Sequence, residues 1–204
     1  MSELISALAQ LLLAALLPLL IYLFQPKPRT PFIASIGLTR PPRKAVVLGL
    51  AASLLFVIAG LLLSLLNDEV LQLLRSPDTV TGKLRAMGPG VRTWAVLLLI
   101  AWVKTALAEE IFFRGFMAKL LVRWFGPIGG SILQALVFAL VHVLLFRALT
   151  HTPAPTLSIL FALTFLAGWS IGHIKERYAM GSIVPGWLAH GFGNTIVYAV
   201  IAFG

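Results

Sequence analysis

Cysteine is absent from the sequence, and charged side chains are scarce. Without cysteine the chain can form no disulfide, no thiolate nucleophile and no cysteine-ligated metal site. Charged residues make up 11% of the chain, whereas a typical soluble domain contains about 25%. Hydrophobic residues make up 59% of it. We therefore predict an integral membrane protein.

Acidic residues are the scarcer of the two charge classes, with 7 Asp and Glu against 16 Lys and Arg. The basic residues lie in short loops between apolar runs and form no stripe interleaved with aromatic residues, so we predict no nucleic-acid partner. In such loops, basic residues set membrane topology and contact anionic lipid headgroups. The lipid bilayer is the partner that this charge pattern favours.

Long apolar segments divide the chain. A helix needs about 20 apolar residues to cross a bilayer, and about six segments suit this length: residues 4–24, 45–66, 92–108, 127–146, 156–174 and 182–203. The first has no cleavage pattern after it, so we expect a retained span rather than a signal peptide. The helical pattern of the third continues to Trp124, and Pro127 suits the first turn of the fourth. We predict an all-α, polytopic transmembrane helical bundle that forms a single domain over residues 1–204.

The loop charges predict an orientation. Alternate loops, at residues 25–44, 119–123 and 175–177, hold nine Lys and Arg, and the opposite loops hold five. The nine are Lys27, Arg29, Arg40, Arg43, Lys44, Lys119, Arg123, Lys175 and Arg177. Because positive loops stay in the cytoplasm, we predict that both termini are extracytoplasmic.

Several ionisable or amide side chains interrupt the apolar segments, where they are costly and therefore candidates for function. Glu109 and Glu110 are adjacent, so on a helix they point about 100° apart, while Glu110 and Arg114 are spaced to pair on one face. His142 lies within the fourth segment. His190 and Asn194 share one face of the sixth segment. We predict that these residues converge on one site in a motif-bearing core at about residues 92–204.

The same residue types suit the hydrolysis of an amide or an ester. Burial disfavours the charged form of a carboxylate, which suits it to accept a proton from water. Histidine and asparagine can donate hydrogen bonds to a developing oxyanion. Two histidines and a glutamate also resemble a zinc site, but the sequence contains no H-E-x-x-H motif. A non-catalytic membrane scaffold or partner-binding protein is the alternative, since Gly168 and Gly172 have a spacing typical of helix packing.

Three motifs occur in order, namely Glu109-Glu110-x-x-x-Arg114, Phe138-x-x-x-His142 and His190-x-x-x-Asn194. They resemble the CAAX protease and bacteriocin-processing family of intramembrane proteases, which includes the Ras-converting CAAX endopeptidases. The resemblance implies that Glu109 activates water, His142 helps to place it, and His190 with Asn194 stabilises the oxyanion. Glu110 and Arg114 would then support the geometry of the site.

The resemblance also implies a substrate class. We expect a hydrophobic peptide or a segment of a membrane protein rather than a prenylated substrate, because short loops suit a compact prokaryotic member in a cell membrane. Family members are described both as metalloproteases and as metal-independent glutamate proteases. We favour no metal cofactor, because Asn194 and an arginine-paired glutamate suit an oxyanion site. The alternative is a divalent metal such as zinc, bound by Glu109, Glu110, His142 and His190.

Overall fold

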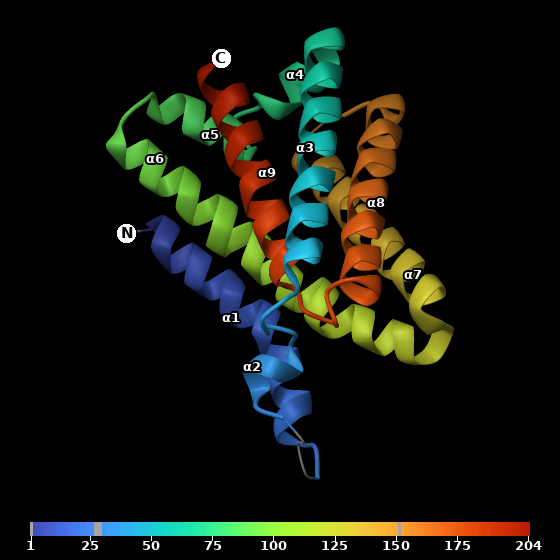
Figure 1. Ribbon diagram of the computed structural model, residues 1–204. Helices are drawn as coiled ribbons and strands as arrows, with labels where there is room; N and C mark the ends of the chain where they lie inside the picture. Colours follow the sequence, from blue (N-terminus) through green and yellow to red (C-terminus); the bar gives the residue numbers. More distant parts are fainter. Residues whose placement is uncertain (1, 27–29, 151) are drawn as a thin grey trace.

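The computed structural model describes residues 2–26, 30–150 and 152–204 as helices joined by short turns and loops (Figure 1). The elements are α1 (Ser2–Leu23), α2 (Phe32–Ser35), α3 (Arg43–Leu66), α4 (Asp68–Leu74), α5 (Val80–Met87), α6 (Val91–Leu98), η1 (Leu99–Leu107), η2 (Glu110–Met117), α7 (Ala118–Leu149), α8 (Ala154–Arg177) and α9 (Val184–Phe203). No strand occurs in the described ranges, so the predicted all-α fold is confirmed.

Local chemistry accounts for several helix ends. The Asn67 side chain accepts a hydrogen bond from the Val70 backbone N–H at the start of α4, and Thr79 caps α5 in the same way. α3 and α8 each follow a proline, which fixes an extended backbone immediately before the first helical residue.

Four helical stretches are long and apolar enough to cross a membrane, namely Ser2–Leu23, Arg43–Leu66, Val91–Leu149 and Ala154–Arg177. The third stretch contains the third and fourth predicted segments. The sixth predicted segment is the helix α9, which is not among the four and carries a histidine, an asparagine and several glycines. Lys27 and Arg29 lie outside the described residues, and the membrane orientation stays a prediction.

The stretch Val91–Leu149 is continuous except at Gly126, where φ is 72° and ψ is 172°. A positive φ favours glycine, and Pro127 begins the second arm in the predicted position. Figure 1 shows the chain turning sharply there, so that the part of α7 after Gly126 returns along the bundle.

The first arm of this stretch is not the regular α-helix that the periodicity predicts. Two π-helical segments, η1 and η2, flank Ala108 and Glu109. The Thr105 hydroxyl donates toward the carbonyls of Ile100 and Ala101, at 2.9 Å and 3.1 Å, and so competes for backbone acceptors inside η1. π-helical turns are rare and are frequently found at functional sites.

The helices pack so that polar groups face inward and many large apolar side chains face outward. Leu12 and Leu13 on α1 are 70% and 69% exposed, whereas Glu110 and Arg114 are 1% and 2% exposed. α9 packs against α3 and η1, α8 packs against α7 and α3, and α1 lies along η1 (Figure 1). This arrangement is typical of a bundle surrounded by lipid, with its costly polar groups inside.

Candidate active site

Glu109 and Glu110 lie where η1, α7 and α9 meet, and they contact different partners. Glu109 Oε2 is 3.8 Å from Nε2 of His142 on α7 and 3.8 Å from Nε2 of His190 on α9. Glu110 Oε1 is 3.1 Å from Nη1 of Arg114. The two side chains point in different directions because adjacent residues on a helix are rotated by about 100°.

The Glu110–Arg114 ion pair is almost fully enclosed, with side-chain exposures of 1% and 2%. The guanidinium carbon of Arg114 lies 4.2 Å from the centre of the Phe138 ring, which suits a cation–π contact. Gly186 on α9 comes so close that a Cβ atom there would overlap Glu110 Oε2. The pair therefore fixes the approach of α7 and α9 to η2.

His142 is held by its own helix. Its Nδ1 is 2.8 Å from the carbonyl oxygen of Phe138, and its ring packs against the Phe138 ring with centroids 4.3 Å apart. A carbonyl can only accept, so Nδ1 carries the hydrogen, and in the neutral ring Nε2 is an acceptor. That acceptor is the atom directed toward Glu109.

His190 lies between the two carboxylates. Its Nδ1 is 3.7 Å from Glu110 Oε1, and its Nε2 is 3.8 Å from Glu109 Oε2. A carboxylate accepts and does not donate, so both ring nitrogens of His190 face acceptors, and both can donate when the ring carries two hydrogens.

Asn194 follows His190 by one helical turn and is anchored to η1. Its Nδ2 donates to the hydroxyl oxygen of Thr105 at 2.9 Å. The same interface carries two indole hydrogen bonds, from Trp102 Nε1 to Thr195 at 3.0 Å and from Trp187 Nε1 to the Trp102 carbonyl at 2.9 Å.

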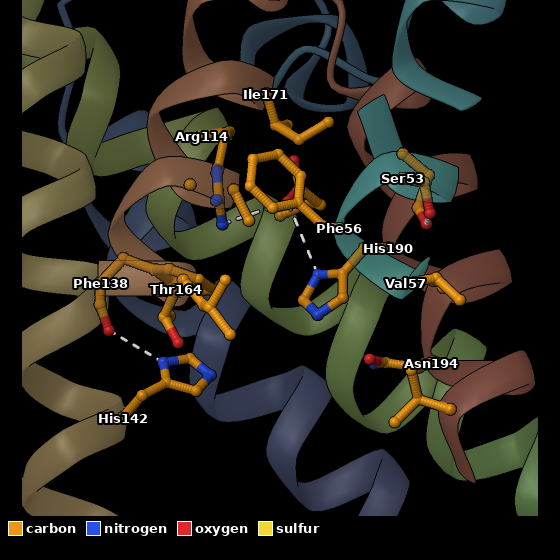
Figure 2. Close-up of a pocket in the computed structure, with 17 residues that line it drawn as sticks. Ser53, Phe56, Val57, Arg114, Phe138, His142, Thr164, Ile171, His190 and Asn194 are labelled. Carbon is orange, nitrogen blue, oxygen red and sulfur yellow. Dashed lines mark hydrogen bonds and ion pairs between the residues drawn. The ribbon is translucent and has the colours of Figure 1, made fainter. Parts of the chain in front are cut away.

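A cavity of about 280 Å³ joins these groups (Figure 2). Arg114, His142, His190 and Asn194 contribute to its wall, together with Glu110. Much of the remaining wall is apolar and comes from α3 and α8: Phe56, Val57, Leu163, Ala167 and Ile171. Figure 2 shows the two imidazole rings and the Asn194 amide turned toward one shared space.

The structure thus brings together the six residues that the sequence singles out. Glu109 is not a lining residue of the cavity, but it contacts His142 and His190, which are. Glu109 Oε2 is buried and has no hydrogen-bond partner among the described residues. An unpaired carboxylate oxygen in such a place is ready to accept a hydrogen bond from a small molecule such as water.

Sequence reasoning missed the residues that bond η1 to α9 beside these groups. Thr105 precedes Glu109 by four residues, so its place in an apolar segment was a signal that could have been used. Trp102, Trp187 and Thr195 gave no such signal, because an interfacial or buried tryptophan is common in membrane helices.

The side chains of this site match the ligand set of a metal ion only in part. In the part of the chain that the structure describes, no three His, Asp or Glu side chains are grouped as a metal site requires. Of the alternative ligands predicted from the sequence, Glu110 is paired with Arg114. Glu109, His142 and His190 remain near one another, with nitrogen–oxygen distances of 3.8 Å.

A family model described as Type II CAAX prenyl endopeptidase Rce1-like matches residues 91–196, just over half of the chain. No curated protein and no solved structure matches the chain. The matched range contains the three motifs that meet at the cavity.

Proposed function

This chain belongs to the Rce1-like family of type II CAAX prenyl endopeptidases, and we propose that it is an intramembrane endopeptidase in which Glu109 activates the hydrolytic water. The substrate is a hydrophobic or membrane-associated peptide or protein. One observation carries the proposal: Glu109 Oε2 is buried, lacks a hydrogen-bond partner, and lies 3.8 Å from both histidines.

The acceptors around Glu109 suit the binding of one water molecule. Polar atoms separated by more than about 3.5 Å are often bridged by water. Glu109 Oε2 and His142 Nε2 are both acceptors at 3.8 Å, so a water between them donates one hydrogen to each. The oxygen lone pairs of that water are then free to attack a carbonyl carbon in the cavity.

The reaction proceeds through a tetrahedral intermediate. The water oxygen forms a bond to the carbonyl carbon while Glu109 accepts the water proton. His190 and the second N–H of the Asn194 amide, on the neighbouring part of the cavity wall, donate to the resulting oxyanion. The carbon–nitrogen bond then breaks, and the proton on Glu109 passes to the leaving amine. Glu110 and Arg114 hold His190 and take no proton.

Replacement of Glu109 by Gln tests this proposal. Three internally quenched peptides serve as probes: a farnesylated peptide ending in a CAAX sequence, its unprenylated counterpart, and a hydrophobic transmembrane peptide. We expect the wild-type protein in detergent to cleave the farnesylated peptide, the transmembrane peptide or both. E109Q should lose at least about 100-fold in kcat, since its amide cannot accept a proton. The Glu3→Gln variant is the matched control.

Two results would overturn the proposal. The first is E109Q turnover equal to that of wild type. The second is a folded wild-type protein that cleaves none of the three probes, which would favour a non-catalytic scaffold of the same fold.

The proposed reaction needs no metal ion. The pairing of Glu110 with Arg114 supports this, since it engages one of the carboxylates that a metal would need. We expect exhaustive chelation, followed by dialysis, to leave the cleavage rate within about twofold of the untreated protein. Loss of activity that zinc restores would contradict a metal-independent reaction while leaving the endopeptidase assignment intact.

A further inference from the structure

The hydroxyl of Thr105 forms the contact that holds the Asn194 amide. Thr105 is on η1 and Asn194 is on α9, and the bond from Asn194 Nδ2 to Thr105 Oγ1 measures 2.9 Å across the interface. Asn194 also lines the cavity beside His190. The bond therefore joins a side chain of the site to a residue outside the three motifs.

The direction of this bond is set by the π-helical backbone of η1. Thr105 Oγ1 lies 2.9 Å from the Ile100 carbonyl and 3.1 Å from the Ala101 carbonyl. A hydroxyl has one hydrogen and a carbonyl can only accept, so that hydrogen is directed to the backbone. Thr105 must then accept from Asn194, which turns the amide nitrogen of Asn194, rather than its oxygen, toward η1.

We propose that Thr105 is a positioning residue for oxyanion stabilisation, an inference that rests on the proposed endopeptidase function. Thr105 uses one of the two N–H groups of the Asn194 amide and prevents the amide from rotating. The second N–H keeps a fixed direction within the cavity wall. A donor aligned before the reaction stabilises developing charge without reorganising during the reaction.

The packing of α9 on η1 does not depend on this bond alone. The indoles of Trp102 and Trp187 bond across the same interface at 3.0 Å and 2.9 Å. Removal of the Thr105 hydroxyl should therefore free the Asn194 amide while α9 stays in place. This separates a positioning role from a purely structural one.

The test is a double-mutant cycle on purified full-length protein, using whichever quenched peptide the wild type cleaves. We expect Thr105→Val to lower kcat about tenfold with little change in KM, the size of effect expected for one lost hydrogen bond. T105S, which keeps the hydroxyl, should recover kcat to within about twofold of wild type. In an Asn194→Ala background, T105V should cause no further loss, because no amide remains to be positioned.

Thr195→Val is the matched control, because it removes a hydroxyl from the same interface without touching the Asn194 amide. It should lower the melting temperature as much as T105V does, but should leave kcat within about twofold of wild type. If T105V does not fold, Thr105→Ala replaces it in the cycle.

Three outcomes overturn the inference: T105V with wild-type kcat, a T105S variant as impaired as T105V, or losses from T105V and N194A that multiply in the double variant. Failure of the proposed function is a different result, since the wild type would then show no cleavage or E109Q would retain it. Cleavage that needs Glu109 but not the Thr105 hydroxyl refutes only the positioning role.

Discussion

The buried Glu110–Arg114 ion pair gives the sharpest test of how the site is held. Its atoms are 3.1 Å apart, and both side chains are at most 2% exposed. Replacing either residue alone by Met leaves the other charge without its partner among apolar groups such as Phe138. Replacing both removes the two charges of the pair together, and Met is of similar length and unbranched.

The expected magnitudes follow from this enclosure. Removing one partner of a buried ion pair costs about 3–5 kcal/mol of stability, whereas replacing both by apolar residues is often neutral or stabilising. About 2–4 °C of melting temperature corresponds to 1 kcal/mol in a chain of this size. We therefore expect E110M and R114M each to melt about 6–20 °C below wild type, and the double variant to melt above both single variants.

Thermal unfolding of the protein in detergent, followed by circular dichroism, measures this difference, and cleavage of a quenched peptide is measured on the same samples. The double variant should fold but cleave poorly, because Glu110 Oε1 no longer lies 3.7 Å from His190 Nδ1. Single variants within about 2 °C of wild type, or losses that add in the double variant, would refute the reasoning.

Three further predictions use contrasting sites. Glu3→Gln breaks a partly exposed ion pair with Lys104 at 3.7 Å, so the melting temperature should change by less than about 4 °C with cleavage unchanged; a larger loss would mean that this pair is also essential. Gly186→Ala should lower stability and cleavage, because its methyl group would overlap Glu110 Oε2, whereas Gly60→Ala, in open space, should not; equal effects would argue against the close approach of α9. Gln134→Met removes a buried amide without a partner and should leave the melting temperature equal or higher, so a fall of more than about 3 °C would show that the amide is bound.

The helices themselves could be predicted because membrane burial leaves a strong pattern. Segments 45–66 and 156–174 correspond to α3 at Arg43–Leu66 and α8 at Ala154–Arg177. The π-helical form of η1 and η2 could not be predicted, since it depends on competition for individual backbone carbonyls, as at Thr105, which leaves hydrophobic periodicity almost unchanged. The sharp turn at Gly126 was signalled by the adjacent proline, a local effect that sequence does contain.

The contacts of the site were predictable only where residues are neighbours on one helix. The pairing of Glu110 with Arg114 follows from their spacing, and so does the shared face of His190 and Asn194. The hydrogen bond between Asn194 and Thr105 joins residues 89 positions apart, and nothing in either segment specifies which turns of α9 and η1 meet. That register is set by the fit of whole helix surfaces, including the glycines of α9.

The two adjacent glutamates show why such a site retains costly groups. Glu110 has its charge offset by Arg114, and its environment is closed. Glu109 Oε2 and Glu110 Oε2 are both buried without a hydrogen-bond partner, at a cost of about 1–3 kcal/mol each. A residue kept only for helix packing would be replaced at little cost by an apolar one, whereas a base must keep an oxygen free to receive a proton. Glu110 is thus paired with an arginine, whereas Glu109 faces two imidazoles. This difference in partners is the physical argument for assigning the chemistry to Glu109 and the support to Glu110.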